Sequence, residues 1–246
     1  MGKPKCTSGS WPPCDLASQE EEISGSCDAR PQGTGRSSVR CEAILLLGPT
    51  GAGKTPLGDL LAAQGLGGRR CVHFDFGAQL RRVAEEGGCG LTADDRAYLQ
   101  KVLTEGALLE DETFYIARAI LEAFMVENGV EAQDLVVLNG LPRHAGQARD
   151  VGEVLRVTRV VALECTAEVV HDRIATNSGG DRGNRIDDSV AQIAAKLELY
   201  AARTHPLLDH YRSEGVQLRL VPVAVETTPD AIVEMLNQSA SETKAR

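Results

Sequence analysis

The stretch Gly48-Pro49-Thr50-Gly51-Ala52-Gly53-Lys54-Thr55 constrains this chain most, because it fits the pattern G-x-x-x-x-G-K-[ST] at every fixed position. A short apolar run, Ala43–Leu47, precedes it, and leucines at helical spacing follow it. Between a strand and a helix, the glycines let successive N–H groups point at phosphate oxygens, and the helix N-terminus adds partial positive charge. A glycine-rich turn that binds nothing is the alternative, and the matching flanks favour the phosphate-binding loop.

The motif assigns roles to its side chains. Lys54 can reach the outer phosphates of a nucleotide, and the Thr55 hydroxyl can ligate Mg²⁺. We expect the donor nucleotide to contact eight residues, Gly48, Thr50, Gly51, Ala52, Gly53, Lys54, Thr55 and Pro56.

Composition excludes several classes of protein. With 246 residues and 42% apolar content, the chain can build one α/β domain, and it has no run of 18 apolar residues that could span a membrane. A net charge of −9 argues against a general nucleic-acid binder. The start of the sequence lacks the layout of a secretion signal, and its seven cysteines form no C-x-x-C pair. We therefore expect reduced thiols and a cytoplasmic location.

The first 38 residues differ from the rest of the chain. They are rich in Ser, Gly, Pro and charge and lack apolar periodicity, so they cannot bury enough surface to offset their ordering entropy. We expect residues 1–38 to be a disordered tail and residues 39–246 to form the folded domain.

Strand and helix patterns alternate through the domain. The predicted strands are residues 43–47, 71–74, 134–138, 159–163 and 216–223. The predicted helices follow the phosphate loop and cover residues 77–86, a segment capped by Thr92, and residues 111–127, 144–155, 166–175, 187–202, 206–214 and 229–238. This alternation predicts a parallel sheet with helices on both faces.

Two side chains at the end of the third strand are candidates for the site. Asn139 and Arg143 follow it, and in an open α/β sheet ligands bind beyond the carboxyl ends of the strands. Arg143 offers a bidentate fork for phosphate, and Asn139 can hold a water bound to Mg²⁺. A surface ion pair is the alternative role for Arg143.

Further arginines suggest contacts with phosphate. Arg173, Arg182 and Arg185 lie within thirteen residues, two of them on a glycine-rich loop, as in a cationic flap that closes over phosphates. Arg81 lies one helical turn after Gly77 and could bind the phosphate of a second substrate. A solvated loop and a surface arginine are the respective alternatives.

Taken in order, these blocks resemble the adenylate kinase and nucleoside monophosphate kinase family over about residues 42–238. Residues 48–55, 73–81, 106–112, 139–147 and 185–188 carry the resemblance. It implies a P-loop NTPase-type three-layer sandwich with a five-stranded parallel sheet. It also implies a helical insert for the monophosphate at about residues 75–110, and a short lid without zinc at about residues 176–186.

The resemblance also implies site roles. ATP and Mg²⁺ are the expected donor and cofactor, with the metal near Thr55 and Asn139. The acceptor would contact Phe76, Gly77, Arg81, Leu109, Gly140, Arg143 and Gln147, and the transferring group would be surrounded by Lys54, Arg143, Arg173, Arg182, Arg185 and Lys196.

The chain departs from the family at several of these positions. Phe76 stands where the family has a threonine near the acceptor base, so an aromatic ring stacks on the base or blocks it. Ala78 and Asn139 replace acidic residues, and Asn177 and Lys196 replace arginines. Lys196 is a point charge rather than a fork, and Arg182 could substitute for a missing guanidinium.

We expect transfer of the ATP γ-phosphoryl group to a nucleoside monophosphate by a monomeric protein that binds small nucleotides, and neither nucleic acid nor membrane. A kinase-like protein that binds nucleotide without turnover is one alternative. Another is a different P-loop kinase or transferase, since Gly48–Thr55 also resembles the start of tRNA dimethylallyl transferases. The negative charge and the Arg185-Ile186-Asp187-Asp188 block speak against a tRNA substrate.

Removing residues 1–38 should leave the melting temperature and the activity nearly unchanged, because this segment lacks residues that could join a core. Thermal unfolding and steady-state rates of the full and truncated chains test this. A large drop in either would show that the segment packs on the domain.

Overall fold

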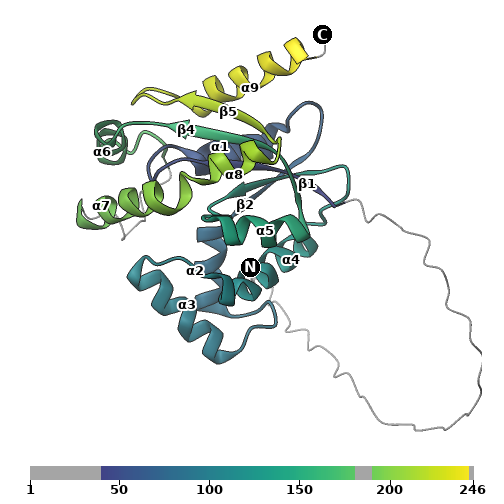
Figure 1. Ribbon diagram of the computed structural model, residues 1–246, viewed down its shortest axis with the longest axis vertical. Helices are drawn as coiled ribbons and strands as arrows, with labels where there is room; N and C mark the ends of the chain where they lie inside the picture. Colours follow the sequence, from purple (N-terminus) through teal and green to yellow (C-terminus); the bar gives the residue numbers. More distant parts are fainter. Residues whose placement is uncertain (1–39, 181–189, 244–246) are drawn as a thin grey trace, which may run out of the picture. The chain divides into compact units, whose positions relative to one another are not determined.

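A computed structural model describes residues 40–180 and 190–243 of the chain. Its centre is a five-stranded sheet in the order β2-β3-β1-β4-β5, and every neighbouring pair is parallel. Figure 1 shows the strands between layers of helices. The strands are β1 (Glu42–Leu47), β2 (Cys71–Asp75), β3 (Leu135–Asn139), β4 (Arg156–Glu164) and β5 (Gln217–Pro222). The expected α/β sandwich with a five-stranded parallel sheet is confirmed.

Helices connect the strands and cover both faces of the sheet. They are α1 (Lys54–Gln64), α2 (Phe76–Glu86), α3 (Ala93–Glu105), α4 (Phe114–Glu127), α5 (Ala145–Val154), α6 (Ala167–Ala175), α7 (Val190–Leu199), α8 (Leu207–Ser213) and α9 (Pro229–Thr243). Between β2 and α4 the chain forms α2 and α3, with α3 on the far side of α2 from the sheet (Figure 1). None of the helices in the described ranges combines the length and apolar character that a bilayer crossing requires.

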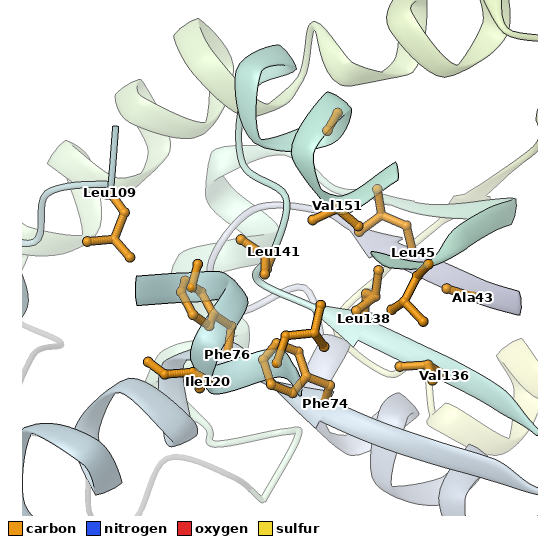
Figure 2. Close-up of a cluster of buried hydrophobic side chains, with 14 of the residues drawn as sticks. Ala43, Leu45, Phe74, Phe76, Leu109, Ile120, Val136, Leu138, Leu141 and Val151 are labelled. Atoms are coloured by element: carbon orange, nitrogen blue, oxygen red, sulfur yellow. The ribbon is translucent and has the colours of Figure 1, made fainter. Parts of the chain in front are cut away.

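Alternating side chains of β1 divide the core into two clusters, one on each face. Ala43, Leu45 and Leu47 join a cluster with α2, α4, α5 and α8, part of which Figure 2 shows. Ile44 and Leu46 join a second cluster with α1 and α9. Because successive strand residues point to opposite faces, the apolar run of β1 is buried on both sides, as expected of a central parallel strand.

Several element ends differ from the sequence prediction. The helix expected from residue 111 begins as a 3₁₀ turn, η1 (Asp111–Thr113), and α9 continues to Thr243. After α7 the chain widens into a π-helical segment, η2 (Tyr200–Thr204). A residue pattern locates such ends poorly, because helix termini fray and depend on tertiary contacts.

The predicted helix cap at Thr92 is confirmed. The Thr92 hydroxyl accepts from the N–H of Asp95, and the Asp95 side chain accepts from the Thr92 N–H. This reciprocal pair satisfies two backbone donors at the start of α3, as a capping box does.

One glycine of α1 is required by a neighbouring ring. A Cβ on Gly58 would lie 2.3 Å from Nε2 of His73, whose side chain is 6% exposed and whose Nδ1 lies 2.8 Å from Asp59 Oδ1. Gly58 therefore allows β2 and α1 to pack closely beside the end of β3.

Gly58→Ala should lower the free energy of unfolding, because overpacking of about 1–3 kcal/mol exceeds the gain of roughly 1 kcal/mol in helix propensity. The matched control is Gly152→Ala in α5, where a Cβ meets nothing within 4 Å and should be neutral or stabilising. Chemical denaturation of both variants provides the measurement. Equal stabilities would show that the His73 ring moves away without cost.

Candidate nucleotide-binding site

The register of the sheet brings three strand ends to one point. Asn139, the last residue of β3, pairs with Leu46 of β1 on one side and with Asp75 of β2 on the other. The chain leaves β1 here and enters the phosphate loop, while α2 begins directly after Asp75. The site is therefore built at the carboxyl ends of the central strands, where ligands bind in open α/β sheets.

The phosphate loop adopts a conformation that requires its glycines. Gly53 caps α1 with φ 95° and ψ 24°, which is left-handed backbone. Gly48 has φ 149°, and a Cβ there would lie 2.9 Å from the Leu163 carbonyl oxygen. The Lys54 ammonium donates to the carbonyls of Gly48 and Pro49, each at 2.7 Å. The loop thus wraps around Lys54 at the N-terminus of α1, as a phosphate cradle must.

One pocket gathers most of the predicted site residues. It is lined by residues of the phosphate loop, α2, the segment after α3, the end of β3 and the α7–η2 segment. The sequence-predicted residues that it brings together are Gly48, Thr50, Gly51, Gly53, Lys54, Thr55, Phe76, Gly77, Arg81, Leu109, Asn139, Gly140, Arg143, Gln147 and Lys196.

Two arginines line the pocket without a side-chain partner among the described residues. The Arg81 and Arg143 guanidiniums form no hydrogen bond or ion pair there. Burial lowers the pKa of the Arg143 guanidinium from its ordinary value, but an arginine stays charged at neutral pH. Arg143 is half-buried, whereas Arg81 is exposed. A half-buried guanidinium without a protein partner suits an anion that supplies the missing hydrogen bonds, and Arg81 lines the same pocket.

Phe76 and Gln147 are packed more tightly than a simple ligand contact requires. Phe76 is 4% exposed and its ring lies 5.9 Å from the Phe74 ring, within the cluster that Figure 2 shows with Leu141 and Leu109. Little of the ring face is open for stacking on a base. Of the two expected effects, stacking and blocking, the burial therefore favours blocking, with the ring as part of the pocket wall. The Gln147 amide accepts from the Arg143 N–H and donates to the Leu109 carbonyl, each at 2.8 Å. Gln147 thereby joins two parts of the pocket wall, the segment after α3 and the backbone of Arg143.

Three predicted residues do not line this pocket. Ala52 is fully buried in the second core cluster, and Pro56 lies in the first turn of α1. Arg173 is 4% exposed, and its guanidinium donates to the Gly51 carbonyl and to three carbonyls of the loop after β5, those of Ala224, Val225 and Thr227. In this structure Arg173 ties the phosphate loop to that loop. The residues Arg182 and Arg185 lie outside the described residues.

Sequence reasoning missed several pocket residues. Asp75 lines the pocket although it was not predicted, and it directly follows residues 71–74, which were predicted to be a strand. The rule that placed Asn139 at the end of a strand would also have found it. Tyr200 and Thr204 of η2 line the pocket as well, and the Thr204 hydroxyl donates to the Arg143 carbonyl at 2.9 Å. No sequence pattern marks a π-helical segment, although such segments are frequent at functional sites.

These features define a P-loop α/β protein with a cleft for phosphates, and the comparisons agree. The AAA domain family matches residues 44–195. Adenylate kinase of Prochlorococcus marinus (strain MIT 9303) is 32% identical over 71% of this chain and 87% of the relative. Adenylate kinase of Synechococcus sp. (strain WH7803) is 30% identical over 80% of this chain and 98% of the relative, and that of Rhodopirellula baltica is 28% identical over 70% and 83%. The chain belongs to the adenylate kinase family.

Replacing Arg173 by Met should lower the free energy of unfolding by at least about 2 kcal/mol, because the hydrogen bonds from its buried guanidinium to the carbonyls of two loops would be lost. The control is Arg118→Met, which removes an exposed arginine paired with Glu122 and Glu153 and should cost less than about 1 kcal/mol. Denaturant unfolding of the two variants compares them. An Arg173→Met protein as stable as the control would assign Arg173 to the ligand rather than to the fold.

Proposed function

We propose that this protein is a nucleoside monophosphate kinase, which transfers the γ-phosphoryl group of ATP to a nucleoside monophosphate. One observation carries the proposal: the phosphate loop with Lys54 and two arginines, Arg81 and Arg143, line the same pocket, and the two guanidiniums have no partner among the described residues. A single polyphosphate needs only the loop. The second cationic pair supports a second phosphate-bearing substrate.

The donor side positions the triphosphate. The loop amides and the N-terminus of α1 bind phosphate oxygens, and Lys54 can exchange its bonds with the loop carbonyls for bonds to the outer phosphates. Arg173 keeps the loop in this conformation through the Gly51 carbonyl. Lys196, which also lines the pocket, adds a further positive charge near the transferred group.

The acceptor side positions the monophosphate. Arg143 and Arg81 would bind its phosphate, and the apolar wall of the segment after α3, including Leu109, would face its nucleoside. An oxygen of this phosphate forms the new bond to the γ-phosphorus as the bond from that phosphorus to the β-phosphate oxygen breaks. Both oxygens belong to phosphates, so the protein supplies alignment and charge stabilisation rather than covalent chemistry.

The donor set of this pocket fits Mg²⁺. The Thr55 hydroxyl at the end of the phosphate loop lies beside the carboxylate of Asp75. Mg²⁺ prefers a few such oxygens together with phosphates and waters. When bound, the ion neutralises charge on the β- and γ-phosphates. The protein's part is to hold the hydroxyl and the carboxylate at the loop.

The experiment that tests the function measures ADP formation from ATP with AMP, CMP, UMP and GMP as separate acceptors. We expect at least one acceptor to support turnover well above the rate without an acceptor. The rival is a nucleotide-binding protein without turnover, which Ala78 favours because it replaces an acid of the family. Binding of ATP with no turnover for any acceptor would establish that rival.

Lys54→Ala should reduce turnover by about 10²-fold or more, because removing a charge that stabilises the transition state costs on this scale. Lys101→Ala is the control: it removes an exposed lysine of α3 outside the pocket and should leave turnover unchanged. Steady-state rates of the two variants, each shown to be folded, measure the effect. Near-normal turnover of Lys54→Ala would remove the phosphate loop from the reaction.

A further inference from the structure

The carboxylate beside the phosphate loop is that of Asp75, which lies at the end of β2 and not at the end of β3. Asn139 and Asp75 are register partners at the ends of β3 and β2, and only Asp75 carries a charge. We propose that Asp75, together with Thr55, holds the magnesium ion of the bound nucleotide, and that Asn139 positions Asp75. This inference rests on the proposed function.

Two side chains converge on one oxygen of Asp75. The Thr55 hydroxyl donates to Asp75 Oδ2 at 2.8 Å, and Asn139 Nδ2 donates to the same oxygen at 3.0 Å. Asn139 Nδ2 also lies 3.1 Å from the Thr55 Oγ1. The other oxygen, Asp75 Oδ1, accepts from the Ala78 N–H at 2.9 Å and caps α2. One oxygen thus fixes the carboxylate to the fold, and the other faces the hydroxyl of the phosphate loop.

Asp75 is the only carboxylate among the described residues that line the pocket, where four cationic residues also lie: Lys54, Arg81, Arg143 and Lys196. Nevertheless, Asp75 forms no ion pair within the described part of the chain. Its negative charge therefore remains available to a cation that arrives with the nucleotide.

The sparse donor set points to Mg²⁺ bound together with phosphates. No group of three or more His, Cys, Asp or Glu residues that could hold a metal occurs in the described ranges. Mg²⁺ does not need such a cage, because it binds through one or two carboxylates, substrate phosphates and waters. The hydroxyl of the last motif residue, here Thr55, is the expected partner on the loop.

Asn139 suits the role of a positioning residue better than that of a ligand. It is 5% exposed, and its amide nitrogen is the end that faces Thr55 and Asp75, since a carboxylate accepts only from a donor. A neutral amide nitrogen does not ligate a cation, because its lone pair is delocalised into the carbonyl group. An acid at position 139 would place two carboxylates side by side and raise the pKa of one, so the amide and the acid form a compatible pair.

The test measures the dissociation constant of ATP, without an acceptor, by isothermal titration calorimetry in Mg²⁺ and again in EDTA. In the native protein we expect Mg²⁺ to tighten ATP binding. Asp75→Asn, which keeps a capping side chain of the same size, should reduce this tightening by about tenfold or more, the scale on which loss of a metal's protein partner acts. Adding Asn139→Asp to that variant should restore it, because the carboxylate returns on the neighbouring strand.

The control Asp94→Asn removes an exposed acid of α3 outside the pocket and should behave as the native protein does. If Asp75→Asn leaves the ratio of the ATP dissociation constants in EDTA and in Mg²⁺ unchanged, the inference is overturned. It is also overturned if Asp75→Asn lowers this ratio and Asn139→Asp does not restore it, because Asp75 would then act only through the fold. Native protein that binds ATP with a Mg²⁺ dependence but forms no ADP with any acceptor would contradict the proposed function alone. Native protein that binds no ATP would overturn both.

Discussion

The parallel pairing of β1, β2 and β3 is the constraint on which the site depends. Its register places Leu46, Asn139 and Asp75 across one level of the sheet, so the phosphate loop, the end of β3 and the start of α2 meet there. A shift of one residue in any strand would turn these side chains to the opposite face. The two core clusters oppose such a shift, because each side chain would then have to pack into the cluster on the other face, which is filled by side chains of different shape.

The site combines groups that the fold fixes with cationic side chains that a charged ligand can complete. Arg173 fixes the phosphate loop through the Gly51 carbonyl, and Gln147 fixes the backbone around Arg143 and Leu109. By contrast, the guanidiniums of Arg81 and Arg143 are held without partners in the described residues. Phosphoryl transfer requires both kinds of group. The fixed groups align the substrates, and the positive charges stabilise the negative charge of the phosphates.

Much of the fold could be predicted from the sequence because local patterns decide it. The phosphate loop, the apolar strands and the Thr92 cap depend on residues close in the chain, and all three are confirmed. The burial of Arg173 and the contact between Asp75 and Thr55 could not be predicted, because each joins residues far apart in the sequence. The same limit applies to η2, whose wider turn follows from packing rather than from a residue pattern. The roles of the individual site residues remain predictions.

The most direct test of the central claim follows the phosphorus atom itself. ATP labelled at the γ-phosphate would be incubated with the native protein and the acceptor that gives the highest turnover, and the labelled products would be separated. The account predicts that the label appears in the terminal phosphate of a nucleoside diphosphate. Label released only as inorganic phosphate would contradict it, because the second cationic pair of the pocket would then not bind an acceptor.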